Sequence, residues 1–598
     1  MTELWDTTIR LLSQEPLAKH VSSTRLLELA SVLDRAGFAC LEVSGGGGFD
    51  AAVRRGVESP WERIRALKTR TTTPLGIALR GRFLVGSRAV HRDIVRRFVA
   101  CAAENGISVF RIHDPLNDVS SLRRSAGAVR EAGGEFHAGL VYSPGRPDEA
   151  DALVEQAREL GDLGAAWVIV NDPTGALSPA SAGDLVGRVA EASGLPVGYY
   201  SQGASGTALA DSLAAVEAGA ELVACAVYPL ALTLHRVSAE SLVQALHGYG
   251  KETGVDAAKL WQASDLVDEH IGDEPVTPLA PRIAVRAAEY DLPTGLVAAI
   301  DVHLRAHAAG DRLLEVLEEI GRVRAEAGWP PLAAPIGQIL ASQALLNVLS
   351  ARRYGSLMDE FRSLVQGRYG TPPAAVDATL ARAVSLLSGD FSLDEGPPTA
   401  EDVRAEAEGL AASEEELVLL AMFGEEAEPL LRTIRARHSR DESLLAQGIE
   451  HTRAERIREL VRIVQESGVA EVEIEDEGMR VSVRRTDQAL QPLGTPLDAG
   501  ESGPAAPASS APDIVNIESP MVGTFYRAPQ PGALPFVEVG DTIVPGQTLC
   551  VLEAMKLMNE VKADLAGVVR RIHVENAQPV EFGQLLFDIE PIVAPPAV

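Results

Sequence analysis

Eight short apolar segments alternate with segments of helical periodicity through residues 1–240 of the chain. Strands that alternate with helices pair in parallel, because each helix carries the chain back to the start of the next strand. Eight such units in succession predict a closed (β/α)8 barrel, in which functional side chains lie where the strands end. The predicted strands are Leu4–Arg10, Cys40–Ser44, Leu75–Arg80, Val109–His113, His137–Tyr142, Trp167–Asn171, Pro196–Gln202 and Leu222–Tyr228.

Composition and periodicity divide the rest of the chain into four parts. We expect an α-helical domain at 241–440. A helix and then a hairpin of Val472–Ile474 with Val481–Val483 are predicted within 441–486. Residues 487–513 are rich in Pro, Ala, Gly and Ser, a composition that cannot bury a core, so this segment is predicted to be a disordered linker.

Residues 514–592 consist of short alternating runs, and the two halves of this segment are similar. Ser519–Gly523 is echoed by Ala563–Gly567, and Gly546–Leu549 by Gly583–Leu586. An internal repeat of short strands predicts two similar β-sheets packed face to face. The segment is therefore predicted to form an all-β, flattened sandwich.

One hairpin of this sandwich carries a lysine between two methionines at its tip. The six residues at the tip are Glu553, Ala554, Met555, Lys556, Leu557 and Met558. They resemble the attachment site of a biotin carboxyl carrier domain, where a biotin protein ligase joins biotin to the lysine. The resemblance implies covalent biotin on Lys556. Lys562, the nearest alternative, is predicted to lie inside a strand.

The carrier resemblance covers residues 453–598. The first half of the β-sandwich is longer than the second, since 23 positions separate Gly523 from Gly546 and 16 separate Gly567 from Gly583. The extra residues, near Arg527–Leu534, resemble the protruding thumb of the acetyl-CoA carboxylase type of carrier. This resemblance implies a biotin carboxylase subunit as partner.

Motifs in the first 435 residues resemble the carboxyltransferase barrel of pyruvate carboxylase and of the oxaloacetate decarboxylase α subunit. The resemblance runs over residues 3–435. Its motifs include Asp6–Arg10, Leu41–Gly46, Pro60–Arg63, Leu79–Gly81, Phe110–Arg111 and Gln343–Leu349. It implies that Arg10, Gln14 and Arg80 bind biotin and substrate oxygens, and with Asp6 and Tyr200 they make up the candidate site for substrate and biotin in the barrel. Read from the residues alone, Arg10, Gln14 and Arg80 could instead form structural ion pairs at the mouth of a barrel.

The metal ligands of that family are largely replaced in this chain. The family binds a divalent ion with an aspartate after the first strand, a carbamylated lysine after the sixth and a His-x-His pair on the seventh. Asp6 matches the aspartate, but the other positions hold Asn171, Tyr200 and Gln202, and Ala298 stands where the family has a threonine. A lone carboxylate does not hold a divalent ion, so we expect no metal and a degenerate carboxyltransferase.

The net charge, the cysteines and the lengths of the apolar runs indicate the environment in which the protein works. The net charge of −30 over 598 residues argues against binding to nucleic acid. Four cysteines, isolated from one another in sequence, suit a reducing cytoplasm. No apolar run is long enough to span a membrane, so a cytoplasmic protein is predicted.

Three functions are compatible with these patterns. The first is the biotin-carrying subunit of a multi-subunit acetyl-CoA or other acyl-CoA carboxylase of fatty acid synthesis. Its inactive barrel would serve as a scaffold for an oligomer, and a separate acyl-CoA carboxyltransferase would complete the reaction. The second is an active carboxyltransferase for pyruvate or oxaloacetate that works without a metal. The third is a protein that stores or senses biotin.

Overall fold

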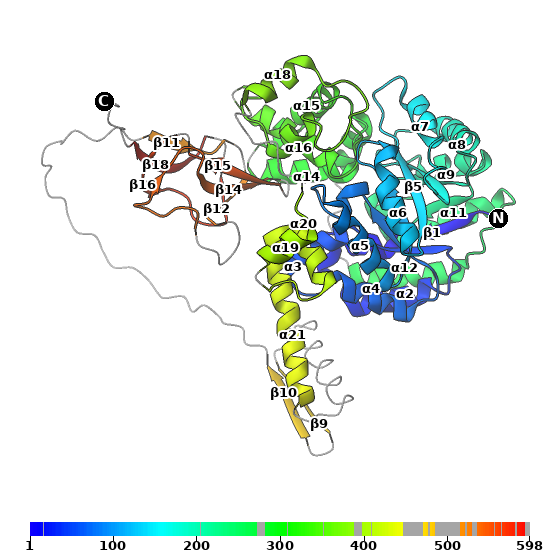
Figure 1. The fold of residues 1–598 in the computed structure, drawn as a ribbon. Helices are drawn as coiled ribbons and strands as arrows, with labels where there is room; N and C mark the ends of the chain where they lie inside the picture. Colours follow the sequence, from blue (N-terminus) through cyan, green and yellow to red (C-terminus); the bar gives the residue numbers. More distant parts are fainter. Residues whose placement is uncertain are drawn as a thin grey trace, which may run out of the picture. The chain divides into compact units, whose positions relative to one another are not determined.

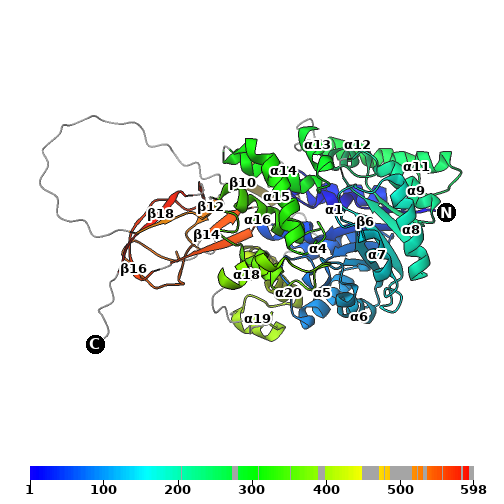
Figure 2. The ribbon, with the colours of Figure 1, turned by 90° about the horizontal axis from the view of Figure 1, so that it is seen from above.

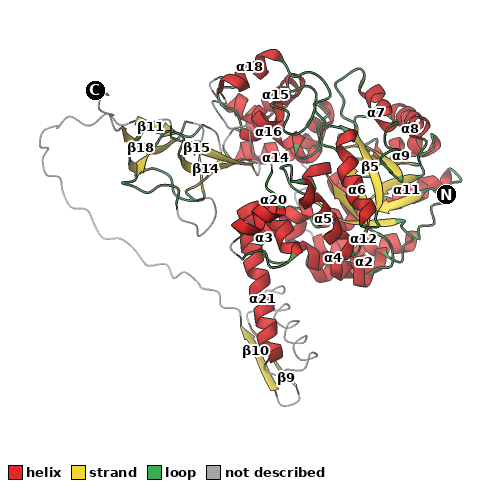
Figure 3. Cartoon of the chain, in the orientation of Figure 1, coloured by secondary structure: helices red, strands yellow, loops and turns green. Residues whose placement is uncertain are grey.

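The computed structural model describes 1–15, 17–203, 205–271, 281–307, 309–350, 352–387, 397–407, 409–446, 471–476, 479–484, 515–520, 523–528, 535–554, 557–563, 565–580 and 583–591. Figure 1 shows the ribbon coloured along the chain, and Figure 3 separates its helices from its strands. No helix among these residues is long and apolar enough to cross a membrane.

Eight parallel strands close into a barrel in the order in which they occur along the chain, with β1 paired to both β2 and β8. The predicted barrel is thereby confirmed. Its strands are β1 (Glu3–Asp6), β2 (Cys40–Gly45), β3 (Leu75–Leu79), β4 (Ile107–His113), β5 (Glu135–Val141), β6 (Trp167–Asp172), β7 (Val197–Ser201) and β8 (Leu222–Cys225).

Helices surround these strands, and Figure 2 shows α7, α8 and α9 on the outer side of β6. They are α1 (Thr8–Leu12), α2 (Ser23–Leu33), α3 (Gly46–Arg55), α4 (Pro60–Arg70), α5 (Arg92–Glu104), α6 (Arg123–Glu131), α7 (Glu149–Ala157), α8 (Pro179–Ser193), α9 (Ala208–Glu217), α10 (Tyr228–Leu234), α11 (Ala239–Gly248) and α12 (Ala257–Ile271). Three 3-10 turns lie among them: Leu17–Lys19, Gly81–Phe83 and Val119–Leu122.

The first predicted strand, Leu4–Arg10, extends four residues beyond the end of the observed strand. The strand ends at Asp6 and helix α1 begins at Thr8, so Arg10 lies on a helix and not on a strand. Two features favour the early turn: the Asp6 carboxylate accepts a hydrogen bond from the backbone N–H of Thr8, 3.0 Å away, and a second from its hydroxyl. Arg10 therefore lies on the helical turn that directly follows the carboxyl end of β1.

The second part of the chain is α-helical, as predicted. Helix α16 is mostly apolar and is buried over most of its length, which makes it the centre of this domain. The helices are α13 (Pro281–Glu289), α14 (Thr294–Ala306), α15 (Leu313–Glu326), α16 (Ile336–Leu349), α17 (Asp359–Val365), α18 (Ala378–Leu387), α19 (Ala400–Glu406), α20 (Glu414–Phe423) and α21 (Glu428–Ala446), with 3-10 turns at Gly310–Arg312 and Gly424–Ala427.

A two-stranded hairpin follows at the predicted place. Strand β9 (Glu471–Asp476) pairs antiparallel with β10 (Met479–Arg484), and Ile474 lies opposite Val481. The helix predicted before this hairpin, the linker at 487–513 and most of the predicted thumb lie outside the described residues.

The C-terminal domain consists of two four-stranded antiparallel sheets, ordered β11-β18-β16-β13 and β15-β14-β12-β17. Phe525 and Phe587, both fully buried, meet in its core with ring centroids 5.9 Å apart. The strands are β11 (Val515–Glu518), β12 (Gly523–Tyr526), β13 (Thr542–Ile543), β14 (Thr548–Ala554), β15 (Leu557–Lys562), β16 (Gly567–Ile572), β17 (Gln578–Val580) and β18 (Leu585–Pro591).

Each sheet takes two strands from each sequence half, and the repeated glycines have matching structural roles. Gly546 and Gly583 adopt left-handed backbone with φ of 87° and 76°, and their N–H groups donate to Ala563 and Ser519 over 2.8 Å in both cases. A Cβ on Gly523 or Gly567 would lie 2.6 or 2.7 Å from a carbonyl of the facing strand. The internal repeat is therefore a structural repeat.

Candidate functional site

The hairpin of β14 and β15 holds the predicted biotin attachment motif. Glu553 is paired with Met558, and Ala554 with Leu557. Met555 and Lys556 separate these paired ends in the sequence and lie outside the described residues. Biotinylation of Lys556 therefore stays a prediction, and what the structure describes is the base of its hairpin.

The base of this hairpin is held by the neighbouring strand β12, which pairs with β14. Thr524 pairs with Glu553, and the hydroxyl of Tyr526 donates a hydrogen bond to Glu553 Oε2 over 3.0 Å. Leu552 is fully buried in the core of the domain. Lys562, which was predicted inside a strand, is the last residue of β15 and pairs with Glu560 over 3.1 Å. A rigid hairpin base fixes where a group carried at the tip can move.

The second candidate site lies at the carboxyl ends of the barrel strands. Asp6, fully buried at the end of β1, keeps its hydrogen bonds to Thr8. Burial raises the pKa of Asp6 to about 7, and the hydrogen bonds from Thr8 oppose this rise. Asp6 is therefore partly protonated near neutral pH.

Arg10 is fixed from two directions. Its Nε lies 2.5 Å from Glu42 Oε1, and its Nη2 donates to the hydroxyl of Tyr200 over 2.7 Å. Glu42, on β2, also accepts two hydrogen bonds from Arg111 of β4, at 2.8 and 3.0 Å. Burial opposes the charge of Glu42, but Arg111 and Arg10 outweigh it and lower the pKa of Glu42. One buried carboxylate therefore positions two arginines.

Tyr200, on β7, is 1 % exposed and lies among cations. The guanidinium of Arg111 lies over its ring at 5.3 Å, and Arg236 interacts with its hydroxyl in addition to Arg10. Burial alone would raise the pKa of Tyr200, but the charges of Arg10 and Arg236 outweigh burial and lower it below its ordinary value. The hydroxyl therefore lies in a strongly positive potential.

Gln14 and Arg80 reach the same mouth because two glycines leave room for them. A Cβ on Gly46 would lie 2.4 Å from Arg80 Nη2, and a Cβ on Gly47 would lie 2.7 Å from Gln14 Cγ. Arg80 donates to the carbonyls of Val85 and Gly86, at 3.4 and 3.0 Å, and Gln14 Nε2 to the carbonyl of Arg10 at 3.2 Å. Burial lowers the pKa of Arg80 to about 10.

The residues at the family's metal positions do not fit a divalent ion. Gln202 Nε2 donates to Asn171 Oδ1 over 3.2 Å, so the two amides are hydrogen-bonded to each other, and the hydroxyl of Tyr200 accepts a hydrogen bond from Arg10. Guanidinium groups in this position repel a cation. Among the described residues no three His, Cys, Asp or Glu side chains are grouped as a metal site.

Two polar residues of the mouth were missed by the sequence analysis. His113 ends β4, and both of its ring nitrogens are buried with no hydrogen-bond partner among the described residues. Burial and the charges of Arg111 and Arg80 lower its pKa to about 3, so the ring is neutral. Its position at the end of a predicted strand could have identified His113 from the sequence.

Arg236 follows α10 and forms an isolated bridge with Gln202, a contact that no sequence pattern indicated.

Models of three protein families match the chain, in the order in which the domains occur. HMGL-like matches residues 2–267, the conserved carboxylase domain matches 288–483, and the biotin-requiring enzyme domain matches 515–589. The conserved carboxylase match includes the β9–β10 hairpin, which the sequence analysis had given to the carrier. A carboxyltransferase-like barrel joined to a biotin domain defines the class of biotin-dependent carboxylases.

Relatives over nearly the full length place the chain within this class. It is 33% identical to a pyruvate carboxylase subunit of Methanocaldococcus jannaschii, over 93% of this chain and 94% of the relative. It is 30% identical to the 2-oxoglutarate carboxylase large subunit of Hydrogenobacter thermophilus, over 93% and 90%. The chain belongs to this family of biotin-dependent carboxylase subunits.

A solved structure agrees with this assignment. The carboxyl transferase domain of Rhizobium etli pyruvate carboxylase superposes with a TM-score of 0.64 and 25% sequence identity, covering 73% of this chain and 77% of that one. The barrel and the helical domain therefore have the fold that the sequence analysis predicted from the carboxyltransferase resemblance.

Proposed function

We propose that this chain is the biotin-carrying carboxyltransferase subunit of a biotin-dependent carboxylase, and that its acceptor is a 2-oxo acid. Biotin is attached to Lys556 by a biotin protein ligase, and a separate biotin carboxylase subunit is the partner that loads it. The chain's relatives, named for pyruvate and 2-oxoglutarate carboxylation, support this choice of acceptor.

The observation that carries the proposal is an excess of cations at the mouth of the barrel. Arg10 and Arg111 share the carboxylate of Glu42, whereas the described hydrogen bonds of Arg80 and Arg236 reach backbone carbonyls. Burial lowers the pKa of Arg80, and the charge of Asp50 offsets this only in part. Withdrawing a charged group from water costs roughly several kcal/mol per ion. A barrel kept as a scaffold gains nothing from this arrangement, but a site for a carboxylate does, because arginine binds carboxylates with two parallel hydrogen bonds.

The residues of the barrel site have separate roles. Biotin, when attached, supplies a ureido nitrogen that carries the carboxyl group. Arg80 binds the carboxylate of the acceptor, and Glu42 holds Arg10 and Arg111 in place while they face the site. The buried strand ends exclude water, which strengthens these interactions.

A two-component assay tests the proposal. The biotinylated protein is mixed with a biotin carboxylase subunit, ATP and labelled bicarbonate, and offered pyruvate, 2-oxoglutarate or acetyl-CoA. We expect labelled product from at least one of the 2-oxo acids and none from acetyl-CoA. Replacing Arg80 with Ala removes a charge-assisted contact and should lower kcat/KM by about ten- to a hundredfold, with Lys562→Arg as a neutral control.

The replaced metal positions favour a second candidate. In it the barrel is an inactive scaffold, the carrier is of the acetyl-CoA carboxylase type, and a separate acyl-CoA carboxyltransferase receives the carboxyl group. The hydrogen bond between Asn171 and Gln202 supports it, because those amides occupy positions that hold ligands in the family. In the same assay, labelled malonyl-CoA that appears only after an acyl-CoA carboxyltransferase is added, with no product from 2-oxo acids, would select this candidate.

A further inference from the structure

The hydroxyl of Tyr200 is the point where two arginines from different parts of the barrel meet. Arg10 reaches it from α1 with a 2.7 Å hydrogen bond, and Arg236 approaches it from the segment after α10. Tyr200 stands on β7 at one of the positions where the family places metal ligands, and the two arginines reach this position from outside the family's ligand set. The place of a metal is therefore taken by hydrogen-bond donors and positive charge.

We propose that the Tyr200 hydroxyl, Arg10 and Arg236 form a metal-free site for the carbonyl oxygen of the acceptor, which becomes an oxyanion during carboxyl transfer. This inference rests on the proposed function. In the transfer, the acceptor carbon next to the carbonyl loses a proton and forms a bond to the carboxyl carbon. The bond between the carboxyl carbon and the nitrogen that carried the carboxyl group breaks, and this nitrogen takes the proton.

Negative charge accumulates on the carbonyl oxygen between these events. Donors that are already oriented stabilise such charge strongly in a site without water. Arg10 is oriented before the substrate arrives, since Glu42 and Tyr200 hold it from two sides. No redox reagent and no further reactant is required.

The Nε–H group of Arg236 is available to donate a hydrogen bond to this oxygen. Its Nη1 donates to the carbonyls of Leu234 and His235, at 3.0 and 3.4 Å, but its Nε is buried without an acceptor among the described residues. A buried N–H without a partner is costly. A ligand oxygen in the mouth would satisfy it, whereas a cation would not.

Binding of oxalate tests the site without relying on turnover. Oxalate is a planar dianion that resembles the enolate of a 2-oxo acid. The full-length protein is dialysed against EDTA, its metal content is measured, and oxalate is titrated by calorimetry. We expect saturable binding without metal, no gain on adding Mn²⁺ or Zn²⁺, and about ten- to a hundredfold weaker binding in Tyr200→Phe and in Arg236→Gln.

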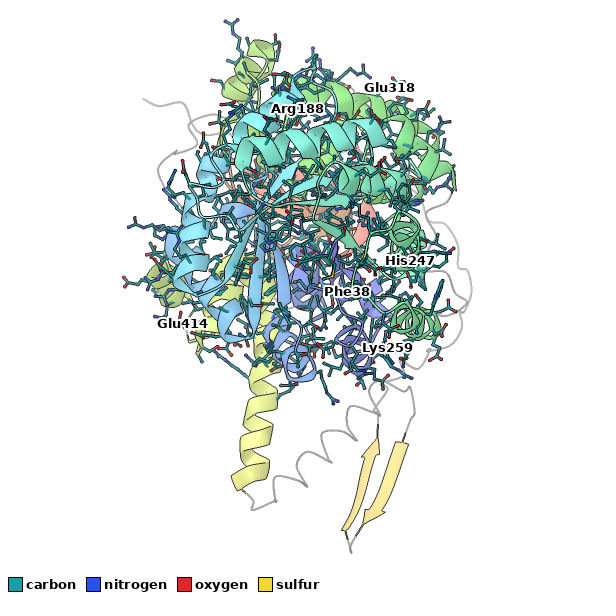
Figure 4. All side chains as sticks on the ribbon, turned by 90° about the vertical axis from the view of Figure 1, so that its right-hand side faces the viewer. Phe38, Arg188, His247, Lys259, Glu318 and Glu414 are labelled. Atoms are coloured by element: carbon teal, nitrogen blue, oxygen red, sulfur yellow. The ribbon has the colours of Figure 1, made fainter. Side chains whose placement is uncertain are left out.

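Arg188→Gln is the matched control, because Arg188 lies on the outer surface of α8 (Figure 4) and its side chain is 36% exposed. Arg236→Lys, which keeps the charge but changes the donors, should retain more affinity than Arg236→Gln. Melting curves check that each variant is folded, and Tyr200→Phe keeps the volume of the ring in case the arginine variants fail this check.

The outcomes separate this inference from the proposed function. A wild-type protein that binds neither oxalate nor any 2-oxo acid contradicts both. Binding and turnover that Tyr200→Phe and the Arg236 variants leave unchanged contradict this inference alone. One tightly held metal ion per chain after dialysis also overturns it.

Discussion

Burial of the Asp6 carboxyl group makes the free energy of unfolding depend on pH. Its pKa is raised to about 7 by burial, whereas an aspartate in an unfolded chain has a pKa of about 3.9. The folded protein therefore holds this proton over a pH range in which the unfolded chain has lost it. The free energy of unfolding falls as the pH rises from about 4 to about 7, and the penalty is fully present above pH 7.

Replacing Asp6 with Asn should remove this pH dependence. Each pKa unit corresponds to about 1.4 kcal/mol, so we expect the variant's barrel to be more stable than the wild type at pH 8 by about 1–3 kcal/mol, after loss of one hydrogen bond to Thr8. At pH 4.5 the two proteins should differ little or in the opposite direction. Urea unfolding followed by circular dichroism at both pH values measures this, and equal differences at both would contradict the assignment of the shift to Asp6.

At the scale of elements, the attachment hairpin depends on a close approach between strands. A Cβ on Gly523 would lie 2.6 Å from the carbonyl oxygen of Glu553, at the base of the β14–β15 hairpin. Strand β12 runs between β14 and β17, so it cannot shift without breaking one of the two pairings. The glycine is required by packing and not by a turn.

Gly523→Ala should destabilise the C-terminal domain by about 1–3 kcal/mol, the usual cost of overpacking. Because the strain falls on Glu553, we also expect a smaller biotinylated fraction on co-expression with a biotin protein ligase. Streptavidin gel shift measures that fraction, and hydrogen exchange of β12 and β14 measures the loosening. Arg570→Ala, on the exposed face of β16, should leave both readouts near the wild-type level, and an unaffected Gly523→Ala protein would show that the strands can move apart at no cost.

At the scale of the whole molecule, the movement of the carrier depends on the segment that precedes it. The composition of residues 487–513 predicts a flexible linker, and a flexible chain of this length has a root-mean-square span of about 30 Å. A tether of this kind keeps the carried group at a high effective concentration near its sites. Such a group can serve the barrel of a neighbouring copy as well as its own, which is the arrangement expected of an oligomer.

Two variants that are impaired in different steps should therefore complement each other. Lys556→Arg keeps the barrel but carries no biotin, and Arg80→Ala carries biotin but binds the acceptor poorly. We expect a mixture of the two, with a biotin carboxylase and a 2-oxo acid, to be more active than the sum of its components. The labelled-bicarbonate assay measures this at several protein concentrations, and a mixture no more active than that sum would mean that each carrier serves only its own barrel.

Much of this protein was determined by local patterns in its sequence. Alternation of apolar runs and helical segments was enough for the barrel, because a parallel strand needs a crossover helix and eight units close the sheet. Repeated glycines were enough for the paired β-sheets, since each one marks a backbone position that a side chain would disturb. The site motif at Glu553–Met558 was readable because its residues are contiguous, and Asp6, Arg10, Gln14 and Arg80 because each belongs to, or lies beside, a short motif.

The tertiary structure alone decided how the mouth of the barrel is assembled. Arg10 was expected on a strand, and only the turn at Asp6 places it on a helix against Glu42 and Tyr200. Arg236 lies 36 positions after Tyr200 in the sequence, and its approach to that hydroxyl depends on how the chain returns after β8. Electrostatic and hydrogen-bond partners are set by closeness in space, which folding creates between residues that no periodicity connects.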